Sequence, residues 1–108
     1  MVTRSVIESV RVYLQAVNGS GIPVSFGVIF GSHTRGTANE QSDIDLLVIS
    51  PRFDGKKDRS LVSLLWRLTV RNDHRLEPIA VGEREWREDD SRPIVEIARR
   101  EGQVVEVG

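Results

Sequence analysis

Two aspartates separated by one residue, Asp43 and Asp45, have the residue type and spacing for metal chemistry. In a β-strand, side chains at positions i and i+2 point to the same face, so these carboxylates would project together. Neighbouring carboxylates repel one another unless a cation lies between them, and a divalent ion with oxygen ligands is the natural candidate. Four apolar residues follow Asp45, which predicts a buried strand, where an unpaired carboxylate is costly. We therefore favour a cation site, although an isolated Asp-x-Asp most often forms a turn or a strand cap.

A glycine-bearing turn precedes the acidic pair, and its first residues are Gly31 and Ser32. Glycine permits a positive φ angle and lets a ligand approach the backbone closely. Consecutive backbone amides and the Ser32 hydroxyl can hold an anion, and Arg35 can add a charge-assisted contact to a phosphate. A Gly-Ser pair alone favours a plain turn. Next to an acidic strand, however, it places phosphate donors beside metal ligands, as a metal–nucleoside triphosphate requires.

The remaining candidates are one acid, the two histidines and the two tryptophans. Glu77 interrupts an apolar strand that can lie beside the aspartates, although a glutamate in an edge strand is more often only solvated. His33 lies within the phosphate turn, where contact with a nucleotide and plain exposure in a loop both stay open. His74 is expected at the surface. Trp66 is expected to pack under a neighbouring helix, and exposure of either Trp66 or Trp86 would indicate an interface.

The spacing of apolar residues predicts the elements that position these candidates. Residues 3–17 and 59–71 have apolar side chains at steps of three and four, which predicts amphipathic helices. Strands are expected at 22–30, 44–50 and 76–81, shorter helices at 83–87 and 93–100, and a tail strand at 103–107. Pro78 lacks an amide donor, so strand 76–81 is expected at an edge or interrupted. The order predicts an α/β (α+β) fold, a small mixed β-sheet with helices packed on it, as a single domain over residues 1–108.

Composition limits the classes of function. The chain has 108 residues, 39% hydrophobic and 29% charged, which is typical of a globular domain. Its net charge of −1 gives no support to strong non-specific binding of nucleic acid or of a membrane surface. Without cysteine it has neither disulfides nor thiolate metal sites. We expect no membrane span and no secretory signal, and therefore a cytoplasmic location.

These motifs resemble those of a known family. Residues 31–36, Gly-Ser-His-Thr-Arg-Gly, followed by Ser42-Asp43-Ile44-Asp45, are similar to the signature of the nucleotidyltransferase fold of the DNA polymerase beta superfamily. Within that superfamily the chain resembles the minimal nucleotidyltransferase (MNT) group. Residues 75–79 are similar to the strand that carries the third acid, and residues 86–102 to the closing helix. Thr34 departs from the pattern, since the group commonly has alanine there.

The resemblance implies a site and a reaction. Asp43 and Asp45 would bind two Mg²⁺ ions, and Glu77 would complete the site of the metal that activates the acceptor. Ser32 and the amides around Gly31 would hold the β- and γ-phosphates of ATP. The implied reaction is in-line attack of a hydroxyl on the α-phosphorus with release of pyrophosphate. The candidate site therefore has two parts: catalysis and metal binding by Asp43, Asp45 and Glu77, and nucleotide binding by Gly31, Ser32, Arg35 and Ser42.

The resemblance also implies a protein partner. Minimal members are commonly encoded beside a small helical HEPN-family toxin, and the nucleotidyltransferase is then the antitoxin. The chain would act as a type VII-like antitoxin that transfers AMP to a tyrosine of that toxin. One alternative is a non-catalytic antitoxin that neutralises its partner by binding. Another is a small-molecule nucleotidyltransferase, for example one acting on aminoglycosides, which is disfavoured because no acceptor-binding domain is visible. A homo-oligomer and a hetero-oligomer both stay open.

Overall fold

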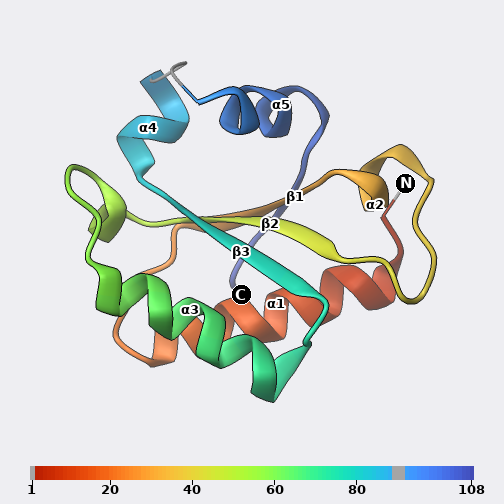
Figure 1. Ribbon diagram of the computed structural model, residues 1–108, viewed down its shortest axis with the longest axis horizontal. Helices are drawn as coiled ribbons and strands as arrows, with labels where there is room; N and C mark the ends of the chain where they lie inside the picture. Colours follow the sequence, from red (N-terminus) through yellow and green to blue (C-terminus); the bar gives the residue numbers. More distant parts are fainter. Residues whose placement is uncertain (1, 89–91) are drawn as a thin grey trace.

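The computed structural model describes residues 2–88 and 92–108 (Figure 1). The elements are α1 (Arg4–Gly19), β1 (Phe26–Phe30), α2 (Ser32–Arg35), β2 (Ile44–Ile49), the 3-10 helix η1 (Pro51–Phe53), α3 (Arg59–Asn72), β3 (Leu76–Val81), α4 (Glu83–Glu88), α5 (Pro93–Glu101) and β4 (Gln103–Val105). The strands form a mixed sheet in the order β3-β2-β1-β4, in which only the β2–β3 pair is parallel. The predicted α/β class, with helices packed on a small mixed sheet, is confirmed.

Strand β2 is the inner strand that carries the acidic pair. Its even-numbered residues, 44 to 48, contribute to the core shared with α1 and α3. Leu47 and Ile49 contribute to a second core, on the face covered by α4 and α5 (Figure 1). An apolar strand buried on both faces requires helices on both faces, because each buried large apolar side chain stabilises the fold by about 1.5–3 kcal/mol. Asp45 shares the alternation of Leu47 and Ile49 and therefore faces the side of α4 and α5.

Helices α1 and α3 pack side by side under the sheet (Figure 1). Thr3 caps α1 by accepting a hydrogen bond from the Val6 amide (3.3 Å), as expected of a threonine at an N-cap. The buried Tyr13 hydroxyl donates to the Leu65 carbonyl oxygen across the two helices (2.8 Å), and burial raises the pKa of Tyr13. Strand β3 lies at the sheet edge, as Pro78 predicts, because proline cannot donate to a second neighbour.

The structure differs from the prediction at several boundaries. The strand expected from residue 22 begins only at Phe26, because the Val24 amide donates to the Asn18 side chain (3.0 Å) instead of to a strand. The turn at 31–41 contains the one-turn helix α2. The tail strand ends at Val105, and the carbonyl oxygen of Val107 accepts from the Gln15 side chain (2.9 Å). Residues 89–91, within the segment 86–102 that resembles the closing helix, lie outside the described residues.

The two tryptophans lie in different environments. The expectation that Trp66 packs under a neighbouring helix is wrong, because its side chain is 46% exposed on α3. Trp86 is half-buried, with its ring edge-to-face with Phe26 at 5.7 Å and the Arg99 guanidinium 5.8 Å from the ring centroid. In the part of the chain that the structure describes, no helix has the length and apolar character needed to cross a membrane.

Candidate active site

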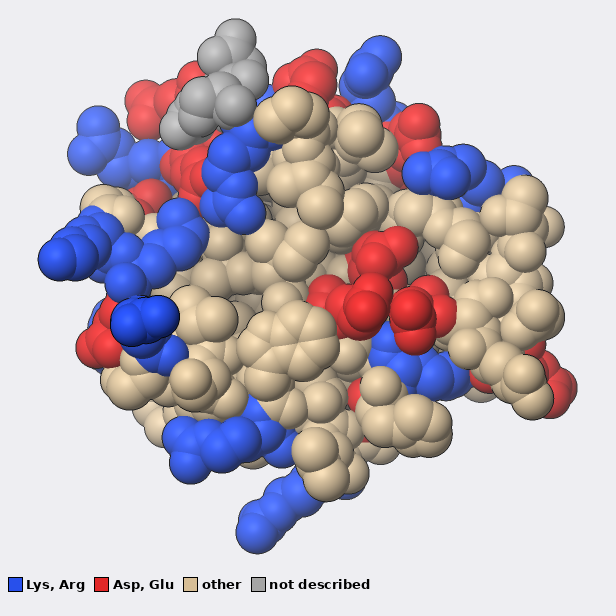
Figure 2. Space-filling view, in the orientation of Figure 1, with Lys and Arg blue, Asp and Glu red and all other residues tan. Residues whose placement is uncertain are grey.

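Asp45 and Glu77 come together through the parallel pairing of β2 and β3. The register places Asp45 opposite Glu77, so both side chains lie on the same face of adjacent strands. Their carboxyl groups are close enough for each to influence the pKa of the other. Asp43 lies two residues before Asp45, is exposed, and acts electrostatically on both groups. Acidic side chains gather in one patch over this end of the sheet (Figure 2).

Burial and neighbouring carboxylates raise the proton affinity of Asp45 and of Glu77. Burial, and then the Asp43 carboxylate, raise the pKa of Asp45, while the hydrogen bond with Glu77 and the nearby His33 and Arg35 partly oppose this. Burial, followed by the charges of Asp43 and Asp45, raises the pKa of Glu77. Ionising all three groups together is therefore unfavourable, and a cation at this site would relieve the repulsion.

The chemistry of the three acids fits a divalent metal ion. All the candidate ligands are carboxylate oxygens, the type that Mg²⁺ prefers. In the described ranges, no three His, Cys, Asp or Glu side chains are already arranged around one point as metal ligands. Asp45 and Glu77 lie opposite each other on adjacent strands, where a cation between their carboxylates would offset their charges. The metal assignment of Asp43, Asp45 and Glu77 stays a prediction.

Gly31 brings the turn directly against the acids. It is the N-cap residue of α2 with φ of 82°, a conformation that glycine adopts without strain. A Cβ atom at this position would lie 2.3 Å from Oδ2 of Asp45. Because no side chain fits in that space, Gly31 is needed for the Asp45 carboxylate to lie against the backbone of the turn. The amides of Thr34 and Arg35 donate back to the Gly31 carbonyl oxygen (3.1 and 3.2 Å) and close α2.

The other nucleotide-binding candidates lie around the same turn. Ser32 is the first residue of α2 and is half-buried. Arg35 is exposed at the end of α2, with Nε 3.5 Å from a Glu101 carboxylate oxygen, and its charge lowers the pKa of Asp45. The Ser42 hydroxyl accepts from the Asn39 amide (2.9 Å) and thereby holds the loop before the acids. The nucleotide-binding role of these residues stays a prediction.

The two histidines differ in burial. The exposed-loop interpretation of His33 is wrong, because only 7% of its surface is accessible. Its Nε2 lies 3.3 Å from the carbonyl oxygen of Ser42, so the ring connects α2 to the residue just before Asp43. His74 is exposed, as expected.

Sequence reasoning missed a cluster that positions the loop before the acids. The Asp73 carboxylate accepts two hydrogen bonds from the Arg75 guanidinium (3.0 and 2.7 Å) and one from the Ser9 hydroxyl (2.8 Å). Another nitrogen of Arg75 donates to the Glu40 carbonyl oxygen (3.1 Å), and the Arg75 carbonyl oxygen accepts from the Ile44 amide (2.8 Å). The cluster thus joins α1, the end of α3 and the loop that leads to Asp43. The Asp-x-Arg spacing at 73–75 was the available signal, but the sequence suggested only a helix end.

Replacing Asp73 by alanine is expected to destabilise the fold by about 2 kcal/mol, because it leaves a part-buried guanidinium without its partner. Hydrogen bonds from Arg75 hold the pKa of Asp73 far below its ordinary value, so this stabilisation is present near neutral pH and is lost as the solution becomes strongly acidic. Urea denaturation at pH 7 measures the loss. Glu8→Ala, which breaks an exposed pair with Arg11, is the control and should cost less than about 1 kcal/mol. Equal losses in the two variants would contradict this assignment.

Replacing Glu77 by glutamine is expected to stabilise the metal-free fold increasingly as the pH rises. The folded chain holds protons on Asp45 and Glu77 more tightly than the unfolded chain does, since both pKa values are raised. The penalty in the wild type is therefore absent well below about pH 4, grows as the pH rises through the raised pKa values, and is complete above them. Thermal melts of both proteins in EDTA between pH 4 and 8 measure the difference in Tm. A constant difference across that range would exclude the mutual repulsion.

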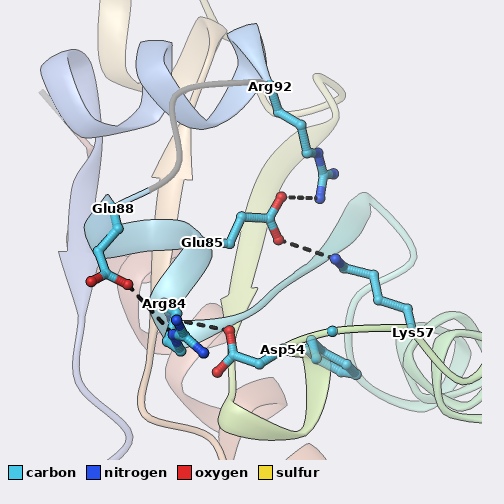
Figure 3. Close-up of a pocket in the computed structure, with 8 residues that line it drawn as sticks. Asp54, Lys57, Arg84, Glu85, Glu88 and Arg92 are labelled. Atoms are coloured by element: carbon cyan, nitrogen blue, oxygen red, sulfur yellow. Dashed lines mark hydrogen bonds and ion pairs between the residues drawn. The ribbon is translucent and has the colours of Figure 1, made fainter.

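A separate pocket lies at the opposite end of the parallel strands, where β2 and β3 lead into η1 and α4. Its volume is about 610 Å³, and its lining residues are Phe53, Asp54, Gly55, Lys57, Arg84, Glu85, Glu88 and Arg92. Figure 3 shows Glu85 between Lys57 (3.1 Å) and Arg92 (2.7 Å), while Asp54 accepts from the Arg84 amide (3.0 Å). These contacts fasten the loop after β2 to α4. Because the lining charges pair with one another and the three acids lie at the other strand ends, we assign this pocket a structural role.

The comparisons with known proteins agree with this geometry. A family model described as "Nucleotidyltransferase domain" matches residues 19–104. A candidate nucleotidyltransferase from Sulfolobus solfataricus has a similar structure, with a TM-score of 0.63 and 19% identity over 91% of this chain and 77% of the other. A structure described as a toxin–antitoxin with AMP-PNP has a TM-score of 0.58 and 18% identity over 87% and 70%. Among curated proteins, none matches with significance. The sheet, the acidic pair and the family match together show that this chain belongs to the nucleotidyltransferase domain family.

Proposed function

We propose that the chain transfers a nucleoside monophosphate, AMP from ATP, to a hydroxyl group in a Mg²⁺-dependent reaction. The observation that carries the proposal is the meeting of Asp45 and Glu77 in register, beside Asp43 and against Gly31. Membership of the nucleotidyltransferase domain family supports the reaction class. The structural neighbour described with AMP-PNP supports an adenine nucleotide as substrate.

In this proposal each part of the site has a separate task. Asp43, Asp45 and Glu77 would hold two Mg²⁺ ions, which when bound lower the pKa of the acceptor hydroxyl and neutralise charge on the leaving pyrophosphate. Ser32 and the amides of the turn would bind the β- and γ-phosphates, and Arg35 would add a cation at the same end. The turn and the two strands thereby orient the α-phosphorus for in-line attack, so that positioning contributes much of the rate enhancement.

We further propose that the acceptor is a tyrosine of a partner protein, a HEPN-family toxin, and that the chain acts as its antitoxin. The resemblance of residues 31–45 to the minimal group supports this, as does the neighbour described as a toxin–antitoxin. The product of the adjacent gene is the first acceptor to examine.

The experiment uses ATP labelled at either the α- or the γ-phosphate. The full chain is incubated with Mg²⁺ and the purified product of the adjacent gene. We expect label from α-labelled ATP on the acceptor protein and label from γ-labelled ATP in pyrophosphate, with neither in EDTA. Transfer of the γ-label to protein would show phosphoryl transfer and refute the proposal. Transfer only to added aminoglycosides would favour the small-molecule alternative.

A non-catalytic antitoxin is the second candidate, and the exposure of Trp66 favours it. Here the chain would neutralise its partner by binding alone. The double variant Asp43→Asn/Asp45→Asn separates the two candidates when it is co-expressed with the partner. Growth inhibition by the partner should return if transfer is needed, and should stay suppressed if binding is sufficient.

A further inference from the structure

The outer surface of α3 exposes two apolar side chains one helical turn apart. Trp66 is 46% exposed and Val70 is 80% exposed. Residues 59, 63, 66 and 70 are spaced by four, three and four, so they form one stripe along the helix. The side of α3 next to this stripe faces the core, where Leu65 and Thr69 are buried. A half-exposed tryptophan with a polar rim is typical of residues that anchor protein interfaces.

The charged side chains of α3 itself all carry positive charge, and the exposed N-cap residue Asp58 directly precedes the helix. Arg59, Arg67 and Arg71 are exposed on the same helix, and residues 59–72 contain no aspartate or glutamate. None of these three arginines forms an ion pair with a described acidic residue. In Figure 2 the lower part of the molecule, over α3, shows Lys and Arg among uncharged residues, whereas the Asp and Glu patch lies above it. The three guanidinium groups are thus available for carboxylates of another molecule.

We propose that this surface of α3 is the docking site for a protein partner that presents acidic side chains around an apolar cleft. Charge complementarity supports acidic side chains on the partner, because three arginines without an ion-pair partner among the described residues attract carboxylates and steer association. The exposed side chains of Val70 and Trp66 support an apolar cleft on the partner. A nucleic acid would satisfy the arginines and stack on Trp66, but its phosphates would gain nothing from Val70. A protein cleft accommodates all of these side chains.

This inference goes beyond the proposed transfer reaction, because docking on α3 does not require the three acids to act. Asp45 and Glu77 face the α4 and α5 side of the sheet, whereas α3 packs on the other face. Variants of α3 should therefore change partner affinity without changing nucleotide affinity. Absence of the transfer reaction would not contradict the docking surface. Loss of docking would not change nucleotide binding.

The test measures affinity for the purified product of the adjacent gene by calorimetry, with the full chain. Trp66→Ala should weaken binding about 30-fold, and Val70→Glu and Arg67→Glu at least tenfold. Val104→Glu is the matched control, because Val104 is a 44% exposed valine on β4 at the far edge of the sheet. It should change the affinity less than twofold. Binding of AMP-PNP with Mn²⁺ should be the same in all variants, and thermal melts establish that each variant folds.

Three results would overturn the docking surface. The first is wild-type affinity in the Trp66, Val70 and Arg67 variants when these proteins are folded. The second is absence of binding between the wild-type chain and the adjacent gene product. The third is binding of a single-stranded oligonucleotide that depends on Arg67 and Trp66 but not on Val70, which would identify a nucleic acid as the occupant.

Discussion

Replacing Asp45 by asparagine should reduce nucleotide transfer by about a thousandfold while raising Tm in metal-free buffer. Asparagine keeps the shape of the side chain but removes the charge that would hold the metal ions, and metal and electrostatic stabilisation account for losses of this size. The same change removes a part-buried carboxylate whose pKa is raised by burial and by Asp43. Its amide can also donate to Glu77, so the repulsion between the two strands disappears.

The combination of lost activity and gained stability is what makes this variant informative. Label transfer from α-labelled ATP measures the first effect, and a thermal melt in EDTA at pH 8 measures the second. Asp54→Asn is the control, because Asp54 lies at the opposite end of the parallel strands and accepts a hydrogen bond from the Arg84 amide. It should retain activity within about twofold. Activity of Asp45→Asn within tenfold of the wild type would show that Asp45 is not a metal ligand.

Replacing Gly31 by alanine should destabilise the fold and remove nucleotide binding at the same time. Alanine at φ of 82° costs about 1–2 kcal/mol for backbone conformation alone. The added Cβ would also lie 2.3 Å from Oδ2 of Asp45, so the carboxylate must move away from its position beside Glu77. We expect Tm to fall by about 10 °C, since 1 kcal/mol corresponds to about 4–8 °C in a domain of this size. Affinity for AMP-PNP with Mn²⁺ should fall at least a hundredfold.

The Gly36→Ala variant distinguishes the effect of backbone strain from the effect of displacing the Asp45 carboxylate. Gly36 ends the same short helix with φ of 79°, but a Cβ there would meet no atom within 4 Å. Backbone strain should cost this variant about 1–2 kcal/mol of stability, and its nucleotide affinity should not change. If Gly31→Ala and Gly36→Ala lose stability equally and both still bind the nucleotide, close contact between the turn and Asp45 has no role in the site.

The parts of the site that depend on local sequence were predictable. In a strand, the spacing of Asp43 and Asp45 predicts that both side chains point to the same face of the sheet. Pro78 predicts an edge strand because proline has no amide hydrogen to donate. The position of Glu77 opposite Asp45 was only a guess, because it depends on a parallel register between strands separated by α3. No local pattern encodes that register. It results from packing of apolar residues of both strands against helices distant in sequence.

The errors also have physical causes. His33 has the polarity of a loop residue, but its ring hydrogen-bonds a carbonyl nine residues away, and this partner makes burial tolerable. Trp66 has the apolarity of a core residue, but it lies beyond the arc of α3 that the sheet and α1 cover. In both cases the tertiary surroundings decided burial: the expectation for Trp66 was wrong, and for His33 residue type left both alternatives open.

The register between β2 and β3 has a consequence for how far such a sequence can diverge. Asp45 and Glu77 meet because β2 and β3 pair through backbone hydrogen bonds. The geometry of these hydrogen bonds sets the separation of the two acids, and it is compatible with different apolar side chains on the two strands. The turn, both acid-bearing strands and the helix between them lie within residues 31–81, whereas α1, α4 and α5 lie outside this segment and cover the faces of the sheet. Substitutions that keep the apolar character and volume of these helices are therefore compatible with the register. Chains that share only 18–19% of their residues with this one accordingly keep its fold.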